Sequence, residues 1–141
     1  MKLIRKLESR CFPAGRRLLL ALVAAVTVVT VNPGVASAAT VRIECTIPAI
    51  SWSYTVCSGP FTVLYAETVK LRLDTSGGKN VEFCVEPEGG GRDFYCAGGW
   101  DPGQTRSLWT NDTGFPQRVQ VIANHGYEVD VRATGEAWTV K

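Results

Sequence analysis

Apolar and polar residues alternate along most of this chain beyond residue 40, and this period of two constrains the fold more than any other feature. Alternation places every second side chain on one face of a strand, whereas a helix needs apolar residues three and four positions apart. No window beyond residue 40 carries the helical pattern. The sequence therefore predicts an all-β domain of about eight or nine short antiparallel strands, arranged as a β-sandwich or a flattened barrel.

The first 38 of the 141 residues have the three parts of a secretory signal. A basic segment ends at Arg16-Arg17, an uncharged apolar stretch runs over residues 18–31, and Ala36-Ser37-Ala38 supplies a cleavage site of the small-x-small type. The apolar stretch is shorter than the about 20 residues that span a bilayer. We expect residues 1–38 to be a signal peptide, exported by either the Sec or the twin-arginine route. Residues 39–141 should then be a single secreted, extracellular domain with no membrane attachment.

Net charge argues against one class of function. The whole chain has 15 Lys/Arg and 13 Asp/Glu, but residues 39–141 alone have nine basic and twelve acidic residues. A mildly acidic domain lacks the basic surface on which nucleic-acid binding depends. We therefore expect no nucleic-acid partner.

Four cysteines lie in the expected domain: Cys45, Cys57, Cys84 and Cys96. An even number in a short exported chain predicts two disulfides, for which three connectivities exist. The first two cysteines and the last two are each twelve residues apart, and these equal short intervals favour local pairing. The absence of a Cys-x-x-Cys motif and the presence of a single distant histidine argue against a metal site.

The segment from Val69 to Glu86 predicts a hairpin, because one register satisfies both of its faces. Pairing Leu73 with Val81 places the apolar residues of both strands together. The same register sets Arg72 beside Glu82 on the opposite face, which is a favourable cross-strand pair.

The next strand is expected to return beside the second strand of this hairpin. A strand over residues 92–97 can oppose Cys84 with Cys96, which also brings Phe83 beside Ala97. This register puts the disulfide on the outer face, where it would staple two strands together.

The C-terminal region predicts a second meander. Asn124-His125-Gly126 has the composition of a three-residue hairpin loop, and Thr134-Gly135 that of a tighter turn. Val119 would then face Val131, and Val131 would face Trp138, so that three strands share one apolar face.

The remaining strands are less constrained. Turn residues on both sides predict a strand near residues 105–110. Residues 41–47 and 52–56 both alternate, but a simple hairpin that opposes Cys45 with Cys57 would put their apolar sets on opposite faces. Either a bulge intervenes, or the two strands belong to different sheets.

Catalytic and cofactor motifs are not recognisable in the domain. His125 is the only histidine, and it lies in an expected turn without a nucleophile motif beside it. The sequence contains no Gly-x-Ser-x-Gly, His-Glu-x-x-His or phosphate-binding glycine loop. Asn111-Asp112-Thr113 matches a glycosylation sequon. We expect a protein that is not an enzyme and that needs neither a metal nor a cofactor.

Aromatic residues supply the candidates for binding. Four of them lie near turns or in strands that the pattern does not place, and they either cap the ends of the sandwich or form an exposed surface: Trp52, Tyr54, Trp100 and Trp109. Trp and Tyr give a large contact area at low entropic cost, and their rings also stack on sugars. The first hypothesis is a protein-binding inhibitor of an extracellular hydrolase. The alternatives are a carbohydrate- or cell-wall-binding module that binds a polysaccharide, and a structural extracellular protein without a dedicated site.

The segment from Cys45 through Ser51-Trp52-Ser53-Tyr54 to Cys57 resembles the Trp-Arg-Tyr region of the tendamistat-type proteinaceous α-amylase inhibitors. The run from residue 69 to residue 105 is loosely similar to them as well. These inhibitors are small exported β-sandwiches with two disulfides, and the resemblance implies that Trp52 and Tyr54 hold the inhibitory positions. The family's arginine, which enters the active site of the amylase, is Ser53 here.

Overall fold

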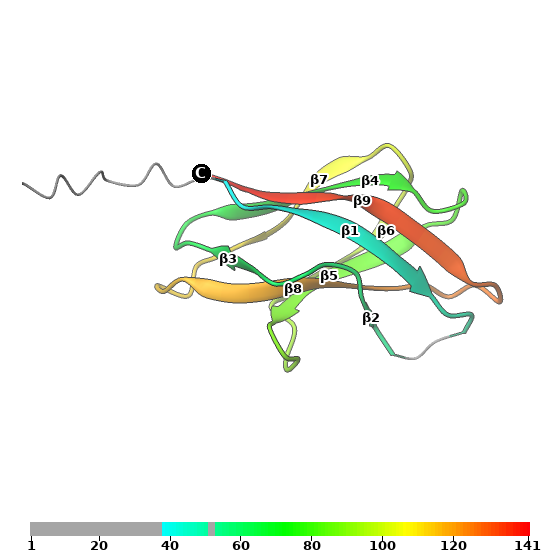
Figure 1. The fold of residues 1–141 in the computed structure, drawn as a ribbon, viewed down its shortest axis with the longest axis horizontal. Coiled ribbons are helices and arrows are strands. Elements are labelled where there is room, and N and C mark those ends of the chain that lie inside the picture. The colour runs from blue at the N-terminus through cyan, green and yellow to red at the C-terminus, as the bar shows by residue number, and fades with distance from the viewer. Residues whose placement is uncertain (1–37, 51–52) are drawn as a thin grey trace, which may run out of the picture. The chain divides into compact units, whose positions relative to one another are not determined.

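The computed structural model describes residues 38–50 and 53–141 (Figure 1). These residues form an all-β domain, with no helix in either described range. Nine strands follow one another along the chain: β1 (Thr40–Ile47), β2 (Thr55–Val56), β3 (Phe61–Val63), β4 (Thr68–Thr75), β5 (Val81–Pro87), β6 (Tyr95–Trp100), β7 (Thr105–Thr110), β8 (Gln117–Asn124) and β9 (Val131–Val140).

The strands form two antiparallel sheets that face each other as a β-sandwich, as the alternation predicts (Figure 1). Sheet A has the order β1-β9-β4-β7, and sheet B has the order β2-β8-β5-β6, with β3 also paired to β8. In β4, for example, Val69, Leu71 and Leu73 are fully buried and the residues between them are not. One buried face per strand is the reason for the period of two.

Two sequence predictions about individual strands are confirmed. β5 and β6 pair in the expected register, with Cys84 opposite Cys96 and Phe83 opposite Ala97. The strand expected near residues 105–110 is β7.

The predicted hairpin between β4 and β5 is wrong. β4 pairs with β9 and β7 in sheet A, whereas β5 pairs with β8 and β6 in sheet B. Arg72 therefore binds Glu136, with 3.2 Å between Nη2 and Oε2, and has no cross-strand pairing with Glu82. Two strands that face each other from different sheets bury their apolar residues in one core, and so do two strands paired in a hairpin. The alternating pattern alone therefore does not distinguish strands of one sheet from strands of two facing sheets.

The predicted C-terminal meander is wrong for a related reason. β8 and β9 lie in different sheets, and β9 continues through Thr134-Gly135 without a turn. Trp138 consequently points away from the core and lies half-buried on the outer face of sheet A, opposite Thr40 and Lys70.

Gly135 is required inside a strand by close backbone packing. Neighbouring β4 has an irregular register between Leu73 and Thr75 at this level. A Cβ atom built on Gly135 would lie 2.0 Å from the carbonyl oxygen of Arg72. Such a distance is far inside van der Waals contact, so no larger residue fits without moving the backbone.

Both disulfides have the local connectivity that the spacing favours. Cys45 lies in β1 of sheet A and Cys57 directly after β2 of sheet B, so this bond joins the two sheets. Of the two alternatives left open by the sequence, a bulge or strands in different sheets, the structure has the second. The second bond joins neighbouring strands of sheet B, and Cys84 is fully buried on the outer face beside Ile122.

We expect Gly135→Ala to lower the free energy of unfolding by about 3 kcal/mol, because the added methyl group must displace the β4 backbone. Gly98→Ala is the matched control: Gly98 also lies in a strand, but no atom lies within 4 Å of the place that its added methyl group would take. Urea unfolding of the two variants measures the difference. Equal stability of the two would contradict the close packing at Gly135.

We expect replacement of Cys45 and Cys57 together by alanine to lower the free energy of unfolding by about 3 kcal/mol, the value for closing a loop of this length. The Cys84–Cys96 bond closes a loop of the same length, because the two cysteines of each bond are twelve residues apart. The entropic contributions of the two bonds should therefore match. We expect the Cys45 and Cys57 variant to have the lower urea midpoint, because its bond also joins the two sheets, and a variant as stable as wild type would contradict that role.

Candidate binding site

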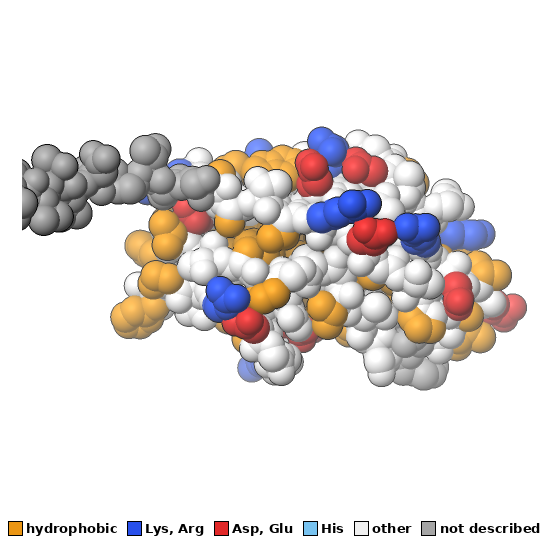
Figure 2. Space-filling view, viewed as in Figure 1, with side chains coloured by type: hydrophobic (Ala, Val, Ile, Leu, Met, Phe, Trp, Pro, Cys, Tyr) orange, Lys and Arg blue, Asp and Glu red, His pale blue; other side chains and the backbone are white. Residues whose placement is uncertain are grey.

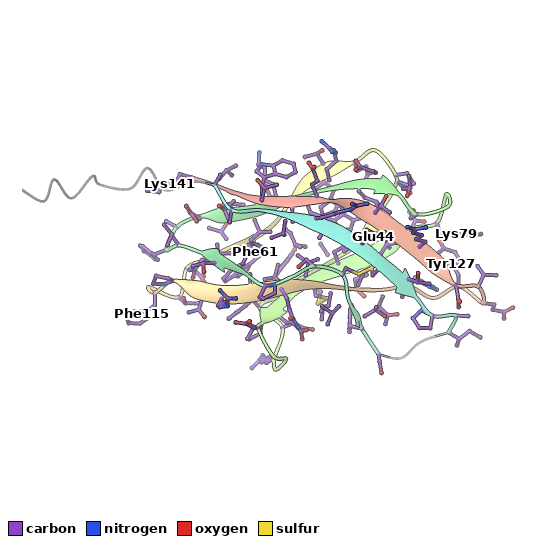
Figure 3. All side chains as sticks on the ribbon, in the orientation of Figure 1. Glu44, Phe61, Lys79, Phe115, Tyr127 and Lys141 are labelled. Carbon is purple, nitrogen blue, oxygen red and sulfur yellow. A yellow bond between two sulfur atoms is a disulfide. The ribbon has the colours of Figure 1, made fainter. Side chains whose placement is uncertain are left out.

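Three connections meet at one end of the sandwich and hold one another in place. The backbone amide of Ile50, in the β1–β2 connection, donates to the carbonyl of Tyr127, in the β8–β9 connection, at 3.0 Å. The amide of Ala49 donates to Asp130 Oδ1 at 2.9 Å. The amide of Asn80, in the β4–β5 connection, donates to the hydroxyl oxygen of Tyr127 at 3.2 Å. Figure 3 shows Lys79 and Tyr127 together at this end, and Phe115 at the opposite end.

His125 connects two of these segments from a buried position. Its Nδ1 accepts from the amide of Tyr127, and its Nε2 lies 3.0 Å from the carbonyl oxygen of Ile47. Because Nδ1 accepts, Nε2 is the ring nitrogen that donates a hydrogen bond to the carbonyl oxygen of Ile47. Both ring nitrogens thus bind backbone groups, which gives His125 a structural task in positioning the end of β1.

A pocket of about 620 Å³ opens at this end of the molecule. Apolar groups of Ile50, Val81 and Tyr127 line part of it. Glu82 and Asn124, which are opposite each other on β5 and β8, supply polar groups. A mostly apolar concavity with a few polar groups is the usual form of a binding site.

Tyr54 lies beside this pocket and binds one of its residues. Its hydroxyl donates to Glu82 Oε2 at 3.0 Å. Burial raises the pKa of the Tyr54 phenol, and the hydrogen bond to Glu82 and the negative charges of Glu82 and Asp93 raise it further. The bond spans β8, because Thr55 is opposite Ala123 and Glu82 is opposite Asn124.

Two aliphatic side chains near Tyr54 are exposed to solvent. Ile50 is 58% exposed and Val56 is 51% exposed, and Tyr54 itself is 37% exposed. We call Ile50, Tyr54 and Val56 the β1–β2 surface. Its two sequence segments are held at their bases by the Cys45–Cys57 disulfide.

The other predicted binding residues do not join this surface. Trp52 lies outside the described residues. Trp100 is fully buried, so of the two alternatives for this ring it is packed within the sandwich and is not part of an exposed surface. Its Nε1 donates to the carbonyl of Ala97 at 2.8 Å, and its ring meets Phe83 edge to face at 5.7 Å. The guanidinium of Arg106 lies 4.7 Å from the ring centroid.

Trp109 is half-buried and stacks on Phe94, with ring centroids 4.7 Å apart and planes inclined by 15°. Trp109 comes from β7 at the edge of sheet A, and Phe94 directly precedes β6 at the edge of sheet B. The stack therefore covers the core between two edge strands. Trp100 and Trp109 do not present two coplanar free rings, as a polysaccharide platform would require.

Several residues of the site are not predicted by the sequence pattern. Ile50 follows Pro48-Ala49 in a connection, and an isolated aliphatic residue in a turn is the only signal that could have indicated it. Glu82 belongs to an ordinary alternating strand, and Tyr127 directly follows the expected loop at residues 124–126, where the pattern gives it no binding role. Their convergence depends on which sheet each strand joins.

Within residues 38–50 and 53–141, potential metal ligands come together at one place only. Among the described residues, the one group of His, Cys, Asp or Glu with ligand atoms close together is Glu82 with Cys84 and Cys96. The two sulfur atoms are bonded to each other and offer no thiolate, which is the form that binds metals. This group is not a metal site.

Asn111, the first residue of the sequon, is fully buried at the opposite end of the sandwich. Its side-chain amide donates to the carbonyls of Val63 and Phe115 at 2.9 and 2.7 Å, and its Oδ1 accepts from the amide and hydroxyl of Thr113. The side chain therefore holds the β7–β8 connection to the end of β3, and in the folded domain it is not accessible for glycosylation.

Comparison of the chain with protein-family models, curated proteins and solved structures returned no match. Across residues 38–50 and 53–141, no helix has the length and hydropathy needed to cross a membrane.

We expect Glu82→Gln to lower the raised pKa of Tyr54 toward the ordinary tyrosine value of about 10, because the variant removes the adjacent negative charge. The titration of Tyr54 is isolated as the difference in phenolate absorbance between each protein and its Tyr54→Phe form. Glu86→Gln, on the same face of β5, should leave the pKa unchanged.

Since folding raises this pKa, the folded state holds the phenolic proton more tightly than the unfolded chain. The resulting stability is fully present below the ordinary tyrosine pKa, and it is lost as the pH rises through the raised value. The stability of wild type relative to Tyr54→Phe should therefore fall as the pH rises through the raised pKa, and thermal unfolding measures this change. A difference between them that is constant across this range would contradict the assignment.

Proposed function

We propose that residues 39–141 are a secreted, non-catalytic binding protein that inhibits an extracellular hydrolase by docking the β1–β2 surface against it. The observation that carries this proposal is the combination of exposed apolar side chains and a braced backbone at Ile50, Tyr54 and Val56. Such a surface loses little conformational freedom on binding, which lowers the entropic cost of association.

The braces act at both ends of the segment. The Cys45–Cys57 disulfide closes its base, and the amides of Ala49 and Ile50 donate to the β8–β9 connection. The hydroxyl of Tyr54 donates to Glu82. Protein interfaces commonly place an apolar or aromatic anchor at the centre of such a rigid patch.

Secretion is supported by two observations. The N-terminal 38 residues have the pattern of an export signal, and the domain contains two disulfides, which form and persist in oxidising compartments. An extracellular location would bring the domain into contact with secreted enzymes.

The resemblance to tendamistat-type inhibitors directs the choice of the first targets. Tyr54, one of the two matching aromatic positions, lies partly exposed on the β1–β2 surface. Ser53 stands where the family has its arginine, so α-amylases should be tested together with secreted proteases.

We expect the domain of residues 39–141 to inhibit at least one secreted hydrolase with an inhibition constant between about 1 nM and 1 μM. Ile50→Asp should weaken inhibition by about 10-fold or more, because a charge would replace an exposed apolar anchor that the proposed partner covers on docking. Phe115→Asp is the matched control, since Phe115 is 72% exposed at the opposite end of the sandwich. Steady-state inhibition assays on a panel of α-amylases and proteases give both measurements.

Two results would contradict this proposal. One is a lack of inhibition of every enzyme in the panel at micromolar concentration. The other is an equal loss of inhibition in Ile50→Asp and Phe115→Asp, which would place the contact elsewhere. Circular dichroism of both variants verifies that they remain folded.

A further inference from the structure

We propose that the pocket beside the β1–β2 surface receives a lysine or arginine side chain of the protein partner, with its cationic end at Glu82. This inference rests on the proposed function, and it adds the chemical class of the group that the partner inserts. The pocket has the two parts that such a side chain needs, which are an apolar wall and a carboxylate.

The apolar wall suits the methylene stem of a long cationic side chain. Ile50, Val81 and Tyr127 line the pocket, and its volume of about 620 Å³ exceeds that of any single side chain. Lys and Arg bury their stems along apolar surface while the charged end stays near polar groups. Asn124 lies opposite Glu82 on β8 and also lines the pocket.

Glu82 is a half-buried carboxylate with no cationic partner at ion-pair distance among the described residues. It accepts a hydrogen bond from the neutral phenol of Tyr54. The carboxylates on the outer face of sheet A are different, because Glu44 binds Arg42 and Arg132 there. Figure 2 shows acidic and basic side chains side by side over β1 and β9. Glu82 therefore has unused capacity for a charge-assisted bond.

Two basic side chains that contact residues of the pocket lining are engaged by other groups. The ammonium of Lys79 lies 5.0 Å from the ring centroid of Tyr127. Arg106 lies over Trp100 and donates to the carbonyls of Gly98 and Gly99 at 3.3 and 3.2 Å. A partner cation thus has no competitor already bound to Glu82.

Electrostatics also disfavours other occupants. A purely apolar group would remove water from Glu82 without replacing its hydrogen bonds, and burial of an uncompensated charge is costly. An anionic group would be repelled by Glu82. Asp101 would add to this repulsion, because it accepts a hydrogen bond from the side chain of Asn80 in the pocket lining. A long cationic side chain is the occupant that satisfies both the wall and the carboxylate.

The direct test is titration of the ¹⁵N-labelled domain with blocked single amino acids, N-acetyl-lysine and N-acetyl-arginine methylamides, followed by amide chemical shifts. The matched probe is N-acetyl-norleucine methylamide, which keeps the aliphatic stem and lacks the ammonium. We expect saturable shifts at Glu82, Asn124 and Tyr127 with a cationic probe. Binding of norleucine should be at least about fivefold weaker, because it forms no bond with the carboxylate.

Two variants test whether the negative charge of Glu82 contributes to binding of the cationic probe. Glu82→Gln keeps the shape of the side chain and should weaken binding of the cationic probe at least about fivefold, as expected for a lost charge-assisted bond. Glu86→Gln is the matched control on the same face of β5, where Glu86 accepts from Gln120 at 2.7 Å. Norleucine binding as tight as lysine binding, or equal loss in the two variants, would overturn the role of Glu82. An absence of shifts with all three probes would overturn the pocket as a site.

Failure of this inference is distinguishable from failure of the proposed function. Inhibition of a hydrolase that depends on Ile50 but is unchanged in Glu82→Gln would leave the proposed function in place and reject the inserted cation. Lysine binding at the pocket without inhibition of any hydrolase would support the site and reject the inhibitor.

Discussion

The disulfide between Cys45 and Cys57 is the constraint on which the arrangement of this domain depends. A sandwich of about 100 residues has a small core, and its two sheets are otherwise held mainly by apolar contact between their inner faces. The bond joins β1, at the edge of sheet A, to the chain that follows β2 in sheet B. Backbone bonds reinforce the junction, since Cys57 donates to Val121 and accepts from Glu44, both at 2.8 Å. The proposed contact surface is built on this junction.

The alternating pattern predicts which residues face the core, but it does not predict which strands are neighbours. The β5–β6 register could be predicted because Cys84 and Cys96 add a second constraint to the alternation. No such constraint exists between β4 and β5 or between β8 and β9, and both connections cross from one sheet to the other. Gly135 shows the same difficulty on a smaller scale. A glycine is common in turns, and only the approach of the Arg72 carbonyl reveals why it lies within a strand.

The candidate site is less predictable than the fold because it is assembled by tertiary contacts. The sequence places Tyr54 among the binding candidates, and this residue does lie partly exposed beside a pocket. Trp100, the last residue of β6, is a candidate on the same grounds, yet its large ring is buried in the core against Phe83. Composition indicates that aromatic rings are available, whereas burial depends on the face that each strand turns inward. Glu82 gains its proposed role only because sheet order brings it next to Tyr54 and Asn124.

The buried amide of Asn111 has a practical consequence for producing the domain. An oligosaccharide transferase recognises Asn111-Asp112-Thr113 in an extended chain, before folding encloses the side chain. A glycan attached at that stage would occupy the nitrogen that otherwise donates to Val63 and Phe115, and these two segments could not then close on each other. Expression in a host with N-linked glycosylation would thus set sugar transfer in competition with folding. A bacterial periplasm that lacks this pathway allows disulfide formation without that competition.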